Sequence, residues 1–168
     1  MAKQQEYADA IALLKADHRT VETLFGQFEK AGDDSRKKAI AHKICVELKI
    51  HTMIEEEIFY PAFRGKIEDD TLDEAYVEHD GAKVLINDIE ASAPDAPCFA
   101  AKVTVLSEEI RHHVHEEEAR GEGMFAQCRR TDVDLVALRD RMLARKEELM
   151  SAGALPPARP SVVQLMPA

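Results

Sequence analysis

The sequence has no tryptophan, few other aromatic residues and only three cysteines in 168 residues. It also has no excess of basic charge, because 32 acidic side chains outnumber 22 lysines and arginines and leave a net charge of −10. Nucleic acids and anionic membrane surfaces attract basic patches, so this balance argues against both as partners. No apolar run approaches the roughly 20 residues that span a bilayer, which argues against a transmembrane protein.

The three cysteines, Cys45, Cys98 and Cys128, are far apart and form no C-x-x-C pair. An odd number without motif spacing is typical of reduced thiols in a cytosolic protein. The opening stretch MAKQQEYADAIALLKADHR contains no apolar run of signal-peptide length. We therefore expect a cytoplasmic protein.

Helical periodicity, in contrast, runs through most of the chain. Apolar residues recur at steps of three and four within about 5–31 and 35–63, and again over 72–89 and 99–117. A further helix is expected over about 132–150, followed by a tail with four prolines in its last sixteen residues. Apolar and polar residues do not alternate with a period of two in any stretch, so no strand is predicted. The pattern predicts an all-α, up-down-up-down four-helix bundle with an additional C-terminal helix and a Pro-rich tail that is extended or disordered.

Ionisable residues interrupt the apolar face of each of the four long segments. The interruptions are His18, His51, His79 and His113, and two of them have a glutamate four residues later, at Glu55 and Glu117. A step of four residues in a helix leaves two side chains about 40° apart and about 6 Å apart along the axis, so they can reach the same ion or adjacent ions.

Counting from the expected loops places the four histidines at one height in the bundle, with mismatches of about one turn or less. A single histidine on an apolar face is most often a satisfied core residue, and a His–Glu pair can be a structural hydrogen bond. Six ionisable groups in one core layer, however, would cost several kcal/mol for each uncompensated charge. A pair of metal ions would neutralise the carboxylates and use the imidazole lone pairs.

The choice of His113 and Glu117 over their neighbours follows from helical phase. Seven and three residues before His113 stand Leu106 and Ile110, whereas His112 and His115 follow mixed or charged faces. Glu116 and Glu118 are therefore expected at the surface or behind the ligands.

Other catalytic patterns are absent from the sequence. A ferritin-like site needs two E-x-x-H pairs, and only Glu109 and His112 have that spacing. There is no H-E-x-x-H zinc motif and no glycine-rich phosphate loop. Cys45 lies beside the apolar face and is more often a packing residue than a nucleophile.

The order of a histidine, an H-x-x-x-E pair, a second histidine and a second H-x-x-x-E pair resembles the hemerythrin-like, or HHE cation-binding, domain family. The strings EEEIFYPAF and HHVHEEE resemble it too, and the likeness covers about 5–127. It implies two non-haem iron ions with an oxo or hydroxo bridge, bound by His18, His51, Glu55, His79, His113 and Glu117, with both glutamates bridging. Oxygen-carrying hemerythrins have another histidine where this chain has Ala75, which argues against a pure reversible oxygen carrier.

The resemblance implies a protein that binds or reacts with dioxygen, peroxide or nitric oxide in oxidative or nitrosative stress, with catalase-like peroxide decomposition as the turnover to test. The alternative is an iron or oxygen sensor, or an iron store, that signals to a protein partner without turnover. Manganese and zinc accept the same ligands. Tyr60 and Tyr76 are candidates for a hydroxyl near the metals. We expect the metal-binding bundle over 1–130, the added helix over 131–151 and the tail over 152–168.

Overall fold

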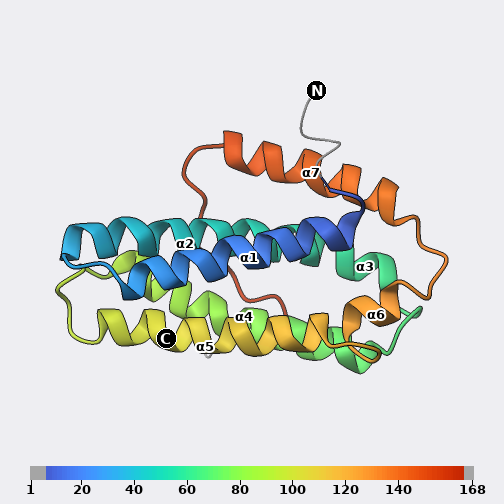
Figure 1. Ribbon diagram of the computed structural model, residues 1–168, viewed down its shortest axis with the longest axis horizontal. Coiled ribbons are helices and arrows are strands. Elements are labelled where there is room, and N and C mark those ends of the chain that lie inside the picture. The colour runs from blue at the N-terminus through green and yellow to red at the C-terminus, as the bar shows by residue number, and fades with distance from the viewer. Residues whose placement is uncertain (1–6, 165–168) are drawn as a thin grey trace.

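The computed structural model describes residues 7–164, and within that range it contains helices and no strand (Figure 1). The predicted all-helical class is confirmed. The elements are α1 (Ala10–Glu29), α2 (Asp34–Ile54), the π-helix η1 (Glu55–Phe59), α3 (Tyr60–Phe63), α4 (Asp69–Ala91), α5 (Phe99–Glu118), α6 (Met124–Cys128) and α7 (Leu135–Ser151). Residues 1–6 and 165–168, at the ends of the expected first unit and of the tail, lie outside the described residues.

The long helices α1, α2, α4 and α5 lie side by side, and α7 lies on the outside against α1, α2 and η1 (Figure 1). Each of the four packs on two of the others, because α1 contacts α2 and α5 while α4 also contacts α2 and α5. The inner faces of the four helices therefore enclose one common core.

The hydrophobic core consists of two clusters, one toward each end of these helices. One cluster contains Leu14, Ile54, Phe59 and Phe125, together with residues of α7, and the other contains Val21, Leu48, Ile86 and Ile110. In α1 the change from the first cluster to the second falls between Leu14 and Val21, at the buried pair Asp17 and His18. A polar layer thus crosses the core where the apolar clusters meet.

Aspartates begin three of the helices. Asp9 and Asp33 accept hydrogen bonds of 2.8 Å from the first-turn amides of α1 and α2, and Asp134 caps α7 in the same way. These bonds satisfy amides that have no partner within a helix. Helix α5 differs from these three, because it begins at Phe99 after Cys98, whose φ of 65° is left-handed and whose side chain makes no capping hydrogen bond.

The helix that carries His113 ends at Glu118, and the chain turns sharply before α6. Two glycines lie in this turn, and each has a structural role. Gly121 has a φ of 86°, a conformation that glycine adopts without strain. Gly123 lies against the end of α5, where a Cβ would come within 2.6 Å of the Ala119 carbonyl oxygen. The tight turn brings Phe125 back to the polar layer, where its ring stacks on that of His18 with the ring centroids 5.9 Å apart.

After α7 the chain continues without regular structure along α4. The backbone amides of Ser161, Val162 and Val163 donate to the carboxylate of Asp80 at 2.7 to 2.8 Å. The side chain of Asn87 exchanges two hydrogen bonds with the backbone of Ala158. The described part of the tail is therefore extended but held in place on the bundle. Among the described residues, no helix combines the length and the apolar character needed to cross a bilayer.

We expect Gly123→Ala to lower the free energy of unfolding by about 1–3 kcal/mol, because the added Cβ would overlap backbone atoms that cannot move independently. Urea unfolding measures the change. Gly26→Ala is the matched control, since nothing lies within 4 Å of a Cβ at that position in α1. The control should stabilise the protein by about 0.5–1 kcal/mol. Similar effects at the two positions would contradict the close approach at Gly123.

Candidate metal centre

The six side chains singled out by the sequence meet in the polar layer of the core. They come from all four long helices and from η1, and each residue is at most 6% exposed. His18 lies on α1, His51 on α2, Glu55 at the start of η1, His79 on α4, and His113 and Glu117 on α5. Ionisable groups buried together in this way require compensating partners, which their mutual geometry supplies.

Four of the side chains form a first group at the α1–α2 side. The Nε2 atoms of His18 and His51 lie 3.2 Å apart. His51 Nε2 lies 3.2 Å from Glu55 Oε2, and His18 Nε2 lies 3.3 Å from Glu117 Oε2. One ligand atom from each residue fits within a sphere small enough for a single ion.

A second group, at the α4–α5 side, contains His79, His113 and Glu55. The Nε2 atoms of His79 and His113 lie 3.2 Å apart. His79 Nε2 lies 3.3 Å from Glu55 Oε2, and His113 Nε2 lies 3.6 Å from Glu117 Oε1. Glu55 therefore faces both groups with one oxygen, while Glu117 offers a different oxygen to each. The two groups form one continuous site joined by two carboxylates.

The other ring nitrogen of each histidine faces an acidic side chain. The Nδ1 distances are 2.7 Å for His18 to Glu118, 3.0 Å for His79 to Glu56 and 2.7 Å for His113 to Glu78. The fourth pair, His51 and Asp17, is wider at 3.6 Å. Such carboxylates fix ring orientation and favour the tautomer that carries its proton on Nδ1. Each Nε2 lone pair then points into the site.

The four outer carboxylates, those of Asp17, Glu56, Glu78 and Glu118, connect neighbouring helices in a closed cycle. Each is adjacent in sequence to one of the six inner residues, yet it contacts a histidine on the next helix around the bundle. Asp17 on α1 reaches α2, Glu56 on η1 reaches α4, Glu78 on α4 reaches α5, and Glu118 on α5 returns to α1. Sequence reasoning placed Glu118 at the surface or behind the ligands and did not single out the other three. The sequence signal was an acidic residue directly beside four of the six inward-facing residues, His18, Glu55, His79 and Glu117.

Two of the imidazoles bind an extra proton when no cation is present. Burial alone would lower the pKa of His18, but the neighbouring carboxylates of Glu117 and Glu118 outweigh it and raise that pKa to about 10. The pKa of His79 likewise rises to about 9, because contact with Glu55 outweighs burial. One protonated histidine therefore lies in each group. These protons take the place of positive charge that the buried carboxylates require.

The residues present fit a pair of cations. Two Nε2 lone pairs that face each other at 3.2 Å cannot hydrogen-bond unless one of them is protonated. Two nitrogens about 2.1 Å from one ion, about 100° apart, would be separated by about the same distance. Glu55 Oε1 and Glu117 Oε2 are buried and accept no hydrogen bond within the described residues. Buried carboxylate oxygens without partners are expected where a cation is the partner.

A π-helical turn places one further polar group in the layer. Glu55 and Tyr60 are five residues apart, and in an α-helix Tyr60 would point about 140° away from Glu55. At η1 the backbone amide of Tyr60 instead donates to the backbone carbonyl of Glu55. The Tyr60 hydroxyl can then donate to Glu117 Oε1 at 3.0 Å or to Glu55 Oε2 at 3.2 Å. Burial and the two carboxylates raise the pKa of Tyr60 well above 10, so it remains a donor.

The other candidate tyrosine, Tyr76, does not bring its hydroxyl to the layer. That hydroxyl donates to the backbone carbonyl of Glu56 at 3.4 Å, and its ring packs against Tyr60 at 5.3 Å. His112 and Glu116 lie outside the core and, with Glu78, form a small surface group.

An apolar cavity of about 20 Å³ adjoins the layer. Its walls include the four histidines and the aliphatic side chains of Val21, Leu48, Ile110 and Val114. This volume holds a molecule the size of one or two waters. The site therefore accepts a very small ligand without rearrangement.

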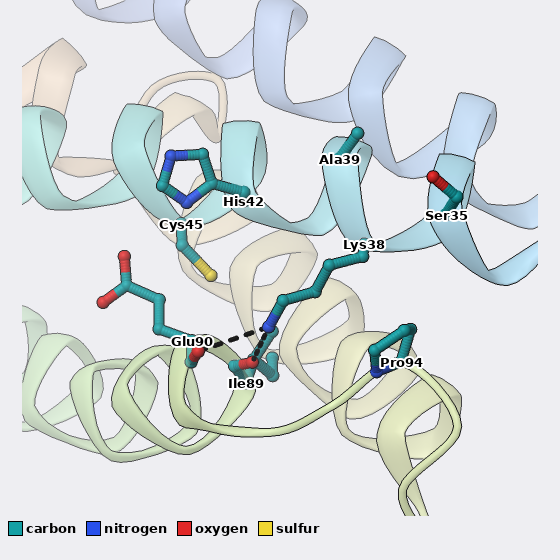
Figure 2. A pocket seen from close by; sticks show the side chains of 8 residues that line it. All are labelled: Ser35, Lys38, Ala39, His42, Cys45, Ile89, Glu90 and Pro94. Atoms are coloured by element: carbon teal, nitrogen blue, oxygen red, sulfur yellow. Dashed lines mark hydrogen bonds between the residues drawn. The ribbon is translucent and has the colours of Figure 1, made fainter.

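A larger surface hollow, about 610 Å³, lies beside α2 and the end of α4 and includes none of the six residues (Figure 2). Lys38 is used there to bind the carbonyl oxygens of Ile89 and Glu90, at 3.2 Å each. Burial, with Glu90 nearby, raises the pKa of the Cys45 thiol to about 12. A thiol of this kind is unreactive near neutral pH.

We expect binding of ferrous iron to release about one proton per ion, from His18 and His79. The affinity for each ion should fall about tenfold for each pH unit as the pH is lowered from 9 to 7. The sign follows from the raised pKa values, because protonated imidazoles compete with the cation. Anaerobic titration in a weakly buffered indicator solution measures the release. His112→Ala, at an exposed ring outside the layer, should leave it unchanged. Affinity independent of pH across this range would contradict the protonation described.

Comparison with known proteins agrees with this geometry. The Hemerythrin HHE cation binding domain model matches residues 9–125, a range that contains all six residues. A DNA nickase of Nostoc sp. (strain PCC 7120 / SAG 25.82 / UTEX 2576) is 30% identical over 107 residues, 64% of this chain but only 30% of that protein. A Hemerythrin HHE cation binding domain-containing protein from Mycobacterium kansasii has a similar fold, with a TM-score of 0.71 and 20% identity over 86% of this chain and 89% of that one. The chain belongs to the hemerythrin HHE cation-binding domain family.

Proposed function

We propose that this chain is a non-haem diiron protein whose reduced site binds or reacts with dioxygen, peroxide or nitric oxide. His18 and His51 would hold one iron, His79 and His113 the other, and Glu55 and Glu117 would bridge them. The supporting domain is the proposed up-down-up-down bundle over 1–130, with the added helix over 131–151 and the tail over 152–168.

The observation that carries the proposal is the sharing of both inner carboxylates. Glu117 has Oε2 3.3 Å from His18 in the first group and Oε1 3.6 Å from His113 in the second. Glu55 has Oε2 within 3.3 Å of a histidine in each group and leaves Oε1 without a partner. Carboxylates placed between two imidazole pairs suit two cations better than one.

The choice of iron follows from the family likeness and from the donor set. Imidazole and carboxylate bind iron, manganese and zinc, and no cysteine sulfur belongs to either group. Four histidines and two bridging glutamates would give each ion about two nitrogen and two oxygen ligands. Ala75, one turn before His79, offers no further donor. Bound iron would therefore supply redox and Lewis-acid chemistry with coordination positions left for a small ligand.

The protein's own contribution is a dry, shaped site. The aliphatic walls of the small cavity exclude bulk water and admit a molecule of the size of a diatomic or peroxide. Tyr60 keeps a proton on its hydroxyl beside both bridging carboxylates and can donate a hydrogen bond there. The outer carboxylates hold the imidazoles in the orientation that exposes Nε2.

We place this activity in a cytoplasmic response to oxidative or nitrosative stress. Cys45, Cys98 and Cys128 are all unpaired, as expected in a reducing compartment. DNA is not part of the proposal, because the chain carries a net charge of −10 and spans only 30% of the related nickase. An iron or oxygen sensor that signals to a protein partner uses the same site and differs in having no turnover.

We expect freshly purified protein to contain two iron ions per chain, and His51→Ala to contain fewer. Metal analysis with an optical spectrum measures this. Removing the iron leaves buried carboxylates neutralised by protons alone, so iron near 100 times its dissociation constant should add about 2.7 kcal/mol and raise Tm by about 5–10 °C. The diiron assignment would be contradicted if the protein bound less than one iron ion per chain and had the same Tm with and without iron.

We expect the iron-loaded protein to convert hydrogen peroxide to water and dioxygen with saturable kinetics. An oxygen electrode measures the release, with free iron at the same concentration and His51→Ala as comparisons. Release no greater than that of free iron would reject the enzymatic function. If iron is bound but no turnover occurs, an iron-dependent change in partner capture would favour the sensor.

A further inference from the structure

The chain beyond the family match returns to the metal centre twice. Helix α7 lies against α1, α2 and η1, and a C-terminal strap, which we define as Leu155–Val163, runs along α4 (Figure 1). Both segments lie outside the matched residues 9–125. Each touches one of the four outer carboxylates.

The first contact comes from Lys146 on α7. Its ammonium donates to Asp17 Oδ1, and the other oxygen of Asp17 lies 3.6 Å from His51 Nδ1. Both Asp17 Oδ2 and His51 Nδ1 are buried and have no other partner within the described residues. The side chains of Lys146 and Asp17 are only 16% and 9% exposed, so water screens their attraction less than at an open surface. Lys146 therefore holds Asp17 facing a ligand of the first group.

The second contact comes from Ser161 on the strap. Its hydroxyl lies 2.6 Å from Glu56 Oε2, and the other oxygen of Glu56 lies 3.0 Å from His79 Nδ1. Lys83, only 4% exposed, donates to both oxygens of Glu56 and to the Ser161 hydroxyl. Ser161 thus completes the hydrogen bonding of the carboxylate that orients a ligand of the second group.

Ser161 is fixed in position by the docking of the strap. Three successive amides, those of residues 161–163, converge on Asp80 at 2.7 to 2.8 Å, which is the arrangement by which backbone amides enclose an anion. Asn87, about two turns after Asp80 in α4, exchanges two hydrogen bonds with Ala158, which precedes Ser161 by three residues. Asp80 is itself only 2% exposed. These five hydrogen bonds hold Ser161 over Glu56.

The other two outer carboxylates have partners from within the matched range. Glu118 pairs with Arg19 at 2.6 Å, and Glu78 lies 3.5 Å from His112. The added C-terminal segment therefore completes one outer carboxylate in each group. In each group, the partner of the remaining outer carboxylate comes from within the matched range.

We propose that Lys146 and Ser161 are positioning residues of the metal centre, with Lys146 acting on the first group through Asp17 and His51, and Ser161 acting on the second through Glu56 and His79. This rests on the proposed function, because it assigns the two groups to two ions. Loss of such outer partners typically weakens metal binding by about 10- to 100-fold. Each residue thus governs the retention of one ion.

The test measures binding of ferrous iron, under anaerobic conditions, by competition with a chelator. Lys146→Met and Ser161→Ala should each lower the affinity for one of the two ions by about 10- to 100-fold. The affinity for the other ion should stay within a few-fold of wild type. The double variant should weaken both. Lys146→Arg and Ser161→Thr should restore binding, which a general loss of stability would not explain.

Matched controls come from the same segment. Arg145→Ala removes ion pairs of α7 with Glu57 and Glu148, and Ser151→Ala removes a hydroxyl bonded only to the Glu147 carbonyl. Neither side chain reaches an outer carboxylate, so both variants should bind two ions as wild type does. Circular dichroism of the metal-free variants checks folding. If Lys146→Met does not fold, Lys146→Gln, which keeps a donor and removes the charge, takes its place.

The outcomes separate the two proposals. Wild-type protein that binds no pair of ions would reject the diiron function itself. Wild-type protein that binds two ions, with the Lys146 and Ser161 variants binding both equally well, would overturn the positioning role and leave the diiron function intact. Equal weakening by the control variants would also overturn it, because the effect would then belong to the stability of the C-terminal segment.

Discussion

Neutralisation of two buried carboxylates, Glu55 and Glu117, is the constraint on which the rest of the structure depends. The four outer carboxylates have cationic or protonatable partners of their own: Lys146, Lys83 and Arg19, with His112 close to the fourth. The inner two face imidazoles and the Tyr60 hydroxyl, and neither has a lysine or arginine partner within the described residues. In the absence of a cation, protons on His18 and His79 supply the opposing charge. The site is thus built so that positive charge is always required, and protons and metal ions compete to provide it.

This requirement accounts for how the helices are assembled. Apolar contacts at either end of the bundle would tolerate sliding of one helix past another, since aliphatic side chains pack without strong directional preference. The polar layer does not, because every imidazole must meet an inner carboxylate on one side and an outer carboxylate from the neighbouring helix on the other. The cyclic pairing around α1, α2, α4 and α5 therefore specifies both their order and their relative height. The π-helical turn adds Tyr60 to the same layer.

The sequence was sufficient to predict the helical class and to single out the six side chains, because helical phase separates His113 from His112 and because each histidine interrupts an otherwise apolar face. It was not sufficient for features that depend on backbone irregularity or on distant segments. A π-turn leaves no mark in a hydrophobic pattern that assumes 3.6 residues per turn, so the closeness of Tyr60 to Glu55 had to come from the structure. The docking of Ser161 on Asp80 joins residues 81 positions apart, and no local pattern encodes it.

The mid-height position of the polar layer has a mechanical consequence. The long helices touch above and below it through two separate apolar clusters, so ions held there would cross-link four rods near their centres. A cross-link at that height would prevent the helices from sliding along one another, so the register of the whole bundle would be tied to occupancy of the site.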